Sequence, residues 1–488
     1  MPESMYFSFA QLQIPLLIPM CISLFGGIIL LGIGALNKIK TRELYIAISL
    51  LFVILNLGFL LLEGNPSPQF GFFNLLLIDG ISILSQILML LATFVLLCFF
   101  MYKNTFTETQ SAEFYALLLF AIAGFAFMVS SENLILILLG LECASLSLYT
   151  MIALHNNTKA FEASIKYFVM GALATAIYAF GAMLLYAATG SLEISHIAYF
   201  LYTHHYEPSI LVFSGFAFLL CALGFKISIV PFHTWVPDVY EGSNPLLAAF
   251  IAIVPKIATF AIIIRIFTPF MYSHSPFIEY VLYALVVLTM TIPNLIALTQ
   301  TDVKRMLAYS SISHSGFVLG AILINAPQIV FLYWFLFLFT NIGAFGILWL
   351  SQNDKDSEDN YTFTSLGGMI KTNTTLAVLL TLFMFALAGI PPFSVFWGKM
   401  YLIQSALSAN YIVLAIIMAL NSVIGAFYYL KVVIYIFAKK PHTASHHSPL
   451  TSSSIFALSL TLIVSIACIF MVQNLLDIIA NYIGSGGF

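Results

Sequence analysis

The sequence predicts an all-α polytopic membrane protein with about 14 transmembrane helices. Of its 488 residues, 61% are hydrophobic and only 8% are charged, and the mean hydropathy is +1.03. A soluble protein of this size carries about a quarter charged residues, so this composition needs lipid as its solvent. The apolar runs are about 20 residues long, which is the length of helix that crosses a bilayer.

These apolar runs recur along the whole chain and set the expected order of the spans. Fourteen crossings place the two termini on the same side of the membrane. We expect the spans to begin near Leu12, Leu44, Leu75, Phe114, Asn133, Phe161, Ile210, Pro245, Pro276, Val303, Pro327, Thr372, Tyr411 and Ser454.

The loops between these spans form two alternating groups that differ in charge. Eleven of the 17 lysine and arginine residues lie in one group, and the other group contains none. Arg265 lies at the border of the second group, where we expect it to anchor its helix at the membrane interface. Asp79 opens a span and is expected to be an N-cap or an interface residue. Because positively charged loops stay on the cytoplasmic side, both termini should face the periplasm.

Two of the predicted spans are interrupted by proline and share a local pattern. The span at 210–242 contains PFHTW, the span at 375–407 contains PPFSVFW, and each carries one lysine near the break. They lie five spans apart and therefore enter the membrane from opposite sides. Corresponding broken helices predict an inverted repeat with the working site at the breaks. The alternative is that an aromatic-rich membrane chain produces such an echo by chance.

Five charged residues lie inside otherwise apolar stretches: Glu142, Lys166, Lys226, Lys256 and Lys399. An isolated charge in hydrocarbon is costly, so such residues usually mark an ion or proton path. Three of the lysines, Lys226, Lys256 and Lys399, lie close to a proline, which leaves the carbonyl four residues earlier without its helical partner and so creates a small polar pocket. The prolines are Pro231, Pro255, Pro391 and Pro392, and the carbonyls are those of Ile227, Ile251, Leu387 and Ala388.

Lysine suits proton transfer because burial disfavours its charged form and a nearby carboxylate favours it, whereas arginine stays charged. Glu142 is the expected carboxylate partner. The alternative is a set of static ion pairs that only fix helix packing. Three lysines at prolines, together with one glutamate, favour proton transfer over that alternative.

Three further residues are candidates for supporting roles. Lys166 lies one turn inside its span, where it either takes part in proton transfer or extends to the inner surface. His233 lies in PFHTW and His314 in SSISHSGF, and imidazole titrates near neutral pH, although either one fits a packing role as well. A loop cluster is read as surface residues rather than as a metal site; it consists of His442, His446 and His447.

Several segments resemble the antiporter-like membrane subunits of respiratory complex I, and PDVYEG and Lys399 favour the N-type branch of that family. The chain departs from the family pattern at Ser243-Asn244-Pro245, where a second proline is common, and this leaves the local geometry open. The segments are FKISIVPFHTWVPDVYEGSNPLLAAFIAIVPKIATFAIIIRIF, KRMLAYSSISHSGFVLGAI, LECASLSLYT and LAGIPPFSVFWGKMYL.

The resemblance implies a fold with two inverted five-helix repeats, each containing a broken helix. We expect an N-terminal three-helix segment at 1–111, the repeats at 112–270 and 271–440, and a C-terminal helix at 441–488. In this family the glutamate matched by Glu142 pairs with the lysine matched by Lys226. The family lysine matched by Lys256 is central to the site, and the family lysine matched by Lys399 connects to the outer exit. The histidines matched by His233 and His314 carry protons between them.

The expected function is that of a proton-translocating membrane-arm subunit of NADH-quinone oxidoreductase in the inner membrane. No Walker loop, GxGxxG, HExxH or CxxC motif is present, so no cofactor is expected on this chain. The resemblance places FMN, iron–sulfur clusters and quinone on partner subunits. The expected partners are other membrane-arm subunits, including antiporter-like ones, and the lipid bilayer. No basic tract suggests nucleic acid.

Two alternatives remain at this stage. One is a subunit of a multi-subunit sodium/proton antiporter, which resembles the same family. The other is a passive membrane scaffold whose buried charges only hold helices together.

Overall fold

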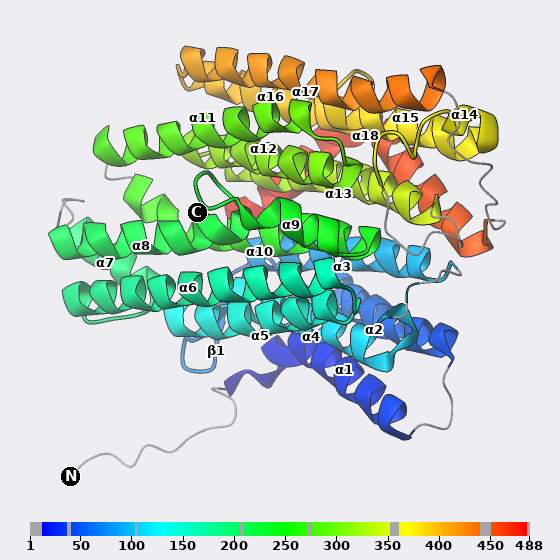
Figure 1. The fold of residues 1–488 in the computed structure, drawn as a ribbon. Helices are drawn as coiled ribbons and strands as arrows, with labels where there is room; N and C mark the ends of the chain where they lie inside the picture. Colours follow the sequence, from blue (N-terminus) through cyan, green and yellow to red (C-terminus); the bar gives the residue numbers. More distant parts are fainter. Residues whose placement is uncertain are drawn as a thin grey trace, which may run out of the picture.

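The long helices lie roughly parallel to one another, from α1 at the bottom of Figure 1 to α17 at the top. The computed structural model describes residues 12–36, 41–102, 106, 108–204, 209–271, 276–351, 361–439 and 450–485. Within these ranges, thirteen helices are long and apolar enough to cross a membrane. They are α1 (Ile18–Leu36), α2 (Arg42–Glu63), α3 (Gly80–Phe100), α4 (Ala112–Val129), α5 (Leu134–Ala153), α6 (Thr158–Thr189), α8 (Ile210–Ile227), α10 (Pro245–Met271), α11 (Pro276–Thr299), α12 (Val303–Leu323), α13 (Pro327–Leu350), α17 (Ile412–Ala438) and α18 (Ser452–Ser485).

The shorter elements include two helices that meet at a proline break, α15 (Thr374–Ala388) and α16 (Ser394–Ser408), of which α15 is apolar but shorter than a span. With thirteen candidate spans in the described residues, the prediction of about 14 is confirmed. A two-stranded antiparallel hairpin of β1 (Gln69–Gly71) and β2 (Leu76–Ile78) precedes α3. The remaining short helices are η2 (Ile14–Leu17), η3 (Glu108–Gln110), α7 (Ile194–Thr203), α9 (Trp235–Gly242) and α14 (Met369–Thr372).

Both predicted breaks are present. After α8 the chain enters the left-handed region at Ser228 (φ 65°) and resumes as α9 at Trp235, whose indole N–H donates to the carbonyl of Phe225 at 3.1 Å. After α15 it turns at Gly389 (φ 82°), where glycine carries no Cβ penalty, and resumes as α16. The first turn interrupts its helix beside Lys226, and the second interrupts its helix beside Lys399. The relation of the two halves as inverted five-helix repeats stays a prediction.

Pro255 behaves differently from the prolines at the breaks. It lies inside α10, which continues without interruption from Pro245 to Met271. The polar pocket expected at Pro255 therefore comes without an interruption of the helix, and Lys256 finds its oxygen partners on α12 instead. A proline inside a helix is tolerated when neighbouring helices support the backbone, and α10 is buried over nearly its whole length.

The interior of the molecule is formed by α10, α12 and α13, which are almost completely buried. The helices at the periphery, such as α6 and α17, carry large exposed apolar side chains. Because exposed Leu173, Val169 and Phe427 would be unfavourable in water, these faces belong against lipid or against another membrane subunit. The fold thus places α10 and α12, which carry Lys256 and His314, in its centre.

Candidate functional site

Three lysines predicted from the sequence are buried on three different helices. The exposed fraction is 4% for Lys226 on α8, 1% for Lys256 on α10 and 6% for Lys399 on α16. None of them points into lipid, and each has a polar partner inside the protein. Partners of this kind are what allow an ammonium group to exist in an apolar interior.

Lys226 lies in the last turn of α8, against α5. Its Nζ donates to the Ser145 hydroxyl at 2.7 Å and lies 3.4 Å from the Tyr149 hydroxyl. The rings of Tyr149, Tyr167 and Phe225 surround the same nitrogen, with centroids 5.5, 5.2 and 5.6 Å away. The faces of these rings attract a cation and replace part of its lost hydration.

A glycine on α6 determines how Tyr149 is placed. A Cβ atom at Gly171 would lie 1.9 Å from the Tyr149 hydroxyl oxygen. No side chain fits in that space, so the hydroxyl packs directly on the α6 backbone. The close approach holds Tyr149 beside Lys226.

Glu142 lies half-buried on α5, where its carboxylate accepts a hydrogen bond from the Thr175 hydroxyl of α6. Among the described residues no ion pair joins Glu142 to Lys226, so the structure does not bring the predicted pair into direct contact. Lys226 instead contacts Ser145, which lies one helical turn after Glu142 on the same helix. Ser145 is thus the nearest hydrogen-bonding group between the two charges along α5.

Lys256 connects α10 to α12. Its Nζ donates to the Ser311 carbonyl at 2.8 Å and to the Ser311 hydroxyl at 2.7 Å. The hydroxyl of Tyr240, on α9, lies 3.3 Å from that same Ser311 hydroxyl. One serine therefore joins the central lysine to the second part of the first broken helix.

His314 lies three residues beyond Ser311 on α12 and is almost completely buried. Its Nδ1 is 2.6 Å from the Tyr333 hydroxyl, and its Nε2 is 3.1 Å from the Tyr429 hydroxyl. Tyr429 also shares a hydrogen bond with the hydroxyl of Ser310. Both ring nitrogens of His314 are therefore engaged by phenols.

Lys399 lies beside the second break, as the proline pattern predicted. Its Nζ donates to the carbonyl of Ala388 at 3.1 Å, which is one of the carbonyls that Pro391 and Pro392 were expected to free. The ammonium group also lies over the ring of Phe317, 5.3 Å from its centroid. The break thus supplies the acceptor that the buried lysine needs.

His233 lies in the break between α8 and α9 and is partly buried. Its Nδ1 has no hydrogen-bond partner among the described residues, and no contact joins it to His314 there. The structure therefore does not bring these two predicted histidines together.

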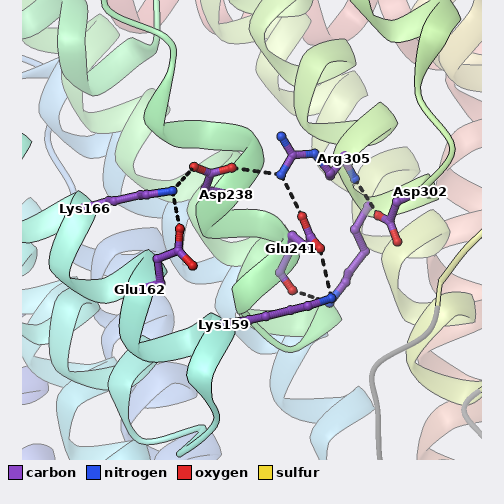
Figure 2. Close-up of polar contacts among 8 residues, drawn as sticks. Lys159, Glu162, Lys166, Asp238, Glu241, Asp302 and Arg305 are labelled. Atoms are coloured by element: carbon purple, nitrogen blue, oxygen red, sulfur yellow. Dashed lines mark hydrogen bonds and ion pairs between the residues drawn. The ribbon is translucent and has the colours of Figure 1, made fainter.

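Lys166 belongs to a surface network of charges at one end of the molecule (Figure 2). It is 42% exposed, and its Nζ lies 2.6 Å from Glu162 and 2.7 Å from Asp238. Arg305 bridges Asp238 at 2.8 Å and Glu241 at 2.7 Å. The network ties the first turns of α6 and α12 to α9, and it keeps Lys166 apart from the buried lysines.

The carboxylates of this network are held in their ionised form. Partial burial raises the pKa of Asp238, but its hydrogen bonds and ion pairs with Lys166 and Arg305 outweigh that effect and hold the pKa below its ordinary value. Burial likewise raises the pKa of Glu241, and the bonds to Arg305 and Lys159 lower it further than burial raises it. Both groups are therefore charged at neutral pH.

Arg265 is not an interface anchor, and this expectation was wrong. Its side chain is 1% exposed, and its Nη2 lies 2.5 Å from the carboxylate of Asp79, which is fully buried. Asp79 also caps α3 by accepting from the backbone N–H of Ser82, as one of its two expected roles required. The pair joins α10 to the start of α3. For a basic residue near the end of a predicted span, the sequence does not show whether the side chain points toward the membrane surface or into the protein.

Four tyrosines at the site were not predicted: Tyr149 beside Lys226, Tyr240 beside Ser311, and Tyr333 and Tyr429 beside His314. The available signal was weak, because the chain contains 24 tyrosines. A tyrosine inside a predicted span needs a partner for its hydroxyl, but the sequence does not identify that partner. The loop histidines His442, His446 and His447 lie outside the described residues.

Comparison with known proteins identifies the family. The profile described as "NADH:quinone oxidoreductase/Mrp antiporter, TM" matches residues 131–425. A subunit N of NADH-quinone oxidoreductase from Helicobacter hepaticus is 73% identical and covers 99% of this chain and 100% of its own length. A chain of respiratory complex I from Thermus thermophilus with bound aureothin matches with a TM-score of 0.80 at 30% identity, over 96% of this chain and 100% of that chain.

A chain of the Mrp complex from a Dietzia species shares the fold, with a TM-score of 0.78 at 21% identity over 95% of this chain and 97% of its own. The subunit N from Helicobacter hepaticus and the chain of respiratory complex I are both more similar in sequence to this chain than the Mrp chain is. The chain therefore belongs to the NADH:quinone oxidoreductase/Mrp antiporter family, among the subunit N chains of the membrane arm of NADH-quinone oxidoreductase.

Proposed function

We propose that this chain moves protons across the membrane through its buried basic groups. Lys226, Lys256, His314 and Lys399 lie on four different helices, and each has a hydroxyl or carbonyl within hydrogen-bonding distance. This set of partnered titratable groups in a membrane interior is the observation that supports the proposal.

The hydrogen bonds form separate groups around Lys226, around Lys256, around His314 and at Lys399. Within each group a proton moves along an existing hydrogen bond, because hydroxyls both donate and accept. Between groups we place ordered water, which bridges polar groups that lack a direct bond. In this proposal protons pass from the Lys226 side through Lys256 and leave from Lys399.

Electron transfer in partner subunits supplies the driving force. Moving one charge against about 100 mV costs about 2.3 kcal/mol, which an external source has to supply. We place FMN, the iron–sulfur clusters and quinone on those partners. A change in the field at Glu142 would favour or disfavour the charged form of Lys226, and so start a transfer.

The surroundings of Glu142 also indicate where a partner subunit binds. Next to it on α5, Leu139 and Leu146 are 60% and 51% exposed, so the carboxylate borders an apolar outer face. A carboxylate that faces lipid is costly. We propose that another membrane-arm subunit, antiporter-like in type, covers this face.

We propose the topology given by the loop charges, with both termini on the periplasmic side of the inner membrane. The network of Lys159, Lys166 and Arg305 then lies at the cytoplasmic end, together with the other basic loops. In the same proposal 112–270 and 271–440 form inverted repeats between the N-terminal segment and the C-terminal helix. Four crossings separate the breaks after α8 and α15, which gives those two helices opposite directions.

The chemistry of the site favours protons over sodium ions. Amines and imidazole exchange protons, whereas hard cations are bound by several oxygen ligands. Lys226 and Lys256 are nitrogen donors, and each has two neutral oxygen partners among the described residues. The sodium/proton antiporter alternative has no such oxygen site in the described part of this chain to support it.

The test is to replace the charged groups in the whole complex and to measure proton transport together with quinone reduction. We expect Lys226→Ala and Glu142→Ala to reduce the protons moved per quinone by at least about tenfold along this path, because a positioned acid or base contributes factors of about 10²–10⁴. The matched control is Lys371→Ala, since Lys371 is exposed on α14. An assembled complex in which both variants pump at the wild-type ratio would support the scaffold alternative instead.

A further inference from the structure

The phenol of Tyr429 on α17 lies between two groups of α12. Its hydroxyl is hydrogen bonded to the Ser310 hydroxyl and lies 3.1 Å from Nε2 of His314. Ser310 and His314 are one helical turn apart on the same face of α12, so the phenol spans that turn from the neighbouring helix. Tyr429 itself is 1% exposed.

The two ends of this bridge lead toward different lysines. Ser310 is next to Ser311, which accepts from Lys256. His314 is bonded to Tyr333, whose ring packs so closely on α16 that a Cβ at Gly398 would lie 2.8 Å from it. Gly398 immediately precedes Lys399. Tyr429 therefore joins a serine beside the Lys256 group to the His314 group, which reaches toward Lys399.

We propose that Tyr429 is a proton-relay residue between Ser310 and His314. The inference rests on the proposed function of the chain and adds to it a residue that actually carries the proton. A phenol suits this position because its one oxygen donates one hydrogen bond and accepts another.

The transfer balances without any other reactant. The Tyr429 O–H bond breaks as an N–H bond forms at Nε2 of His314, and the phenol oxygen receives the proton of Ser310. Ser310 takes its replacement from the Lys256 side through Ser311 and water. The imidazolium then releases its Nδ1 proton to Tyr333, which passes its own proton toward Lys399. One proton enters and one leaves, and every group ends neutral.

The neighbouring Tyr428 lies beside the same link. Its hydroxyl donates to the Asn294 side chain at 2.9 Å, and Asn294 in turn donates to Asn421 at 3.1 Å. It also lies within reach of the Tyr429 and Ser310 hydroxyls. Of the two phenols, Tyr429 is the one whose hydroxyl contacts both Ser310 and the His314 ring.

The experiment uses Tyr429→Phe in the assembled complex, which keeps the ring and removes the hydroxyl. We expect the protons moved per quinone to fall by at least about tenfold. The matched control is Tyr435→Phe, two turns further along α17, where the ring packs on Phe363 at 5.4 Å. It should remain at the wild-type ratio.

A second variant separates a relay from a packing contact. Ser310→Ala removes the other end of the same link, so the double variant with Tyr429→Phe should pump no worse than either single one, whereas Ser310→Thr should retain pumping. Independent packing losses would add instead. If Tyr429→Phe fails to assemble, Ser310→Ala alone decides the matter.

Normal pumping in Tyr429→Phe or Ser310→Ala, together with loss in Lys256→Ala, would overturn the relay and leave the proposed function standing. Normal pumping in all three variants would overturn both. Losses that add in the double variant would also overturn the relay.

Discussion

The ammonium group of Lys226 depends on one tyrosine hydroxyl and on the glycine that makes room for it. Aromatic rings and two hydroxyls replace the water that this charge loses. Because Gly171 allows the Tyr149 hydroxyl to lie against α6, the geometry around Lys226 is sensitive to a single methyl group.

We therefore predict that Gly171→Ala disturbs the site without touching a charge. The new methyl would overlap the Tyr149 hydroxyl and force it away, at a cost of about 1–3 kcal/mol for overpacking. The thermal stability of the purified complex should fall, and so should its protons per quinone. The control is Gly58→Ala on α2, since a Cβ at Gly58 meets nothing within 4 Å. If the two variants had the same thermal stability and the same protons per quinone, the position of the Tyr149 hydroxyl against α6 would not matter for the site.

At the scale of helices, α3 and α10 are joined by a charge pair that is removed from water. The Arg265 guanidinium and the Asp79 carboxylate are both buried, and two of the three guanidinium nitrogens have no partner in the described part of the chain. Removing one partner leaves the other charge uncompensated, which is much worse than losing the pair.

This gives a prediction for α10. Arg265→Met should destabilise the protein by about 3–5 kcal/mol, because ionised Asp79 then stays buried alone. The double variant with Asp79→Asn should recover most of that loss, since asparagine is neutral and still caps α3. Thermal unfolding of the purified complex measures both. A double variant that is less stable than Arg265→Met would contradict this account.

The start of α10 is also where the chain departs from the family pattern, and the structure settles that geometry. The Asn244 side chain accepts from the backbone N–H of Leu247 and so caps α10, while its amide donates to buried Glu108 at 3.0 Å. Ser243 donates to the carbonyl of Val239 at 2.6 Å. These polar residues therefore end α9 and begin α10 in this chain.

At the scale of the whole molecule, the surface network of Figure 2 ties α6, α9 and α12 together at one end. These helices come from both predicted repeats. The network therefore restrains α9, the second part of a broken helix, relative to both halves. Its strength depends on carboxylates whose pKa values lie below the ordinary ones.

The network predicts a pH dependence with a definite sign. A carboxylate with a lowered folded-state pKa stabilises the fold above its unfolded pKa, about 3.9 for aspartate, and loses that effect as the pH falls through the folded value. The melting temperature of the complex should therefore exceed that of Asp238→Asn at neutral pH, and the difference should shrink below about pH 4. Exposed Glu113→Gln is the control. A difference that does not change with pH would exclude ionised Asp238 as its cause.

The limits of prediction lie at particular residues. The breaks beside Lys226 and Lys399 were visible because proline removes a backbone donor wherever it stands. Pro255 removes a backbone donor in the same way, but neighbouring helices support α10 around it, so no break forms there. Glu142 and Lys226 were expected in direct contact, yet Ser145 and Tyr149 are the groups that meet Lys226, since side-chain direction depends on how α5 and α8 pack.

The sequence by itself determined the membrane class, the number of crossings, the two interrupted helices and the residues whose charge is costly in lipid. Those properties follow from composition, run length and backbone chemistry, which act locally along the chain. Only the tertiary structure decided that Arg265 turns inward to Asp79, that Ser311 joins Lys256 to α12, and that Tyr429 contacts both Ser310 and His314. These contacts join residues far apart in sequence, and they exist only once the helices have packed.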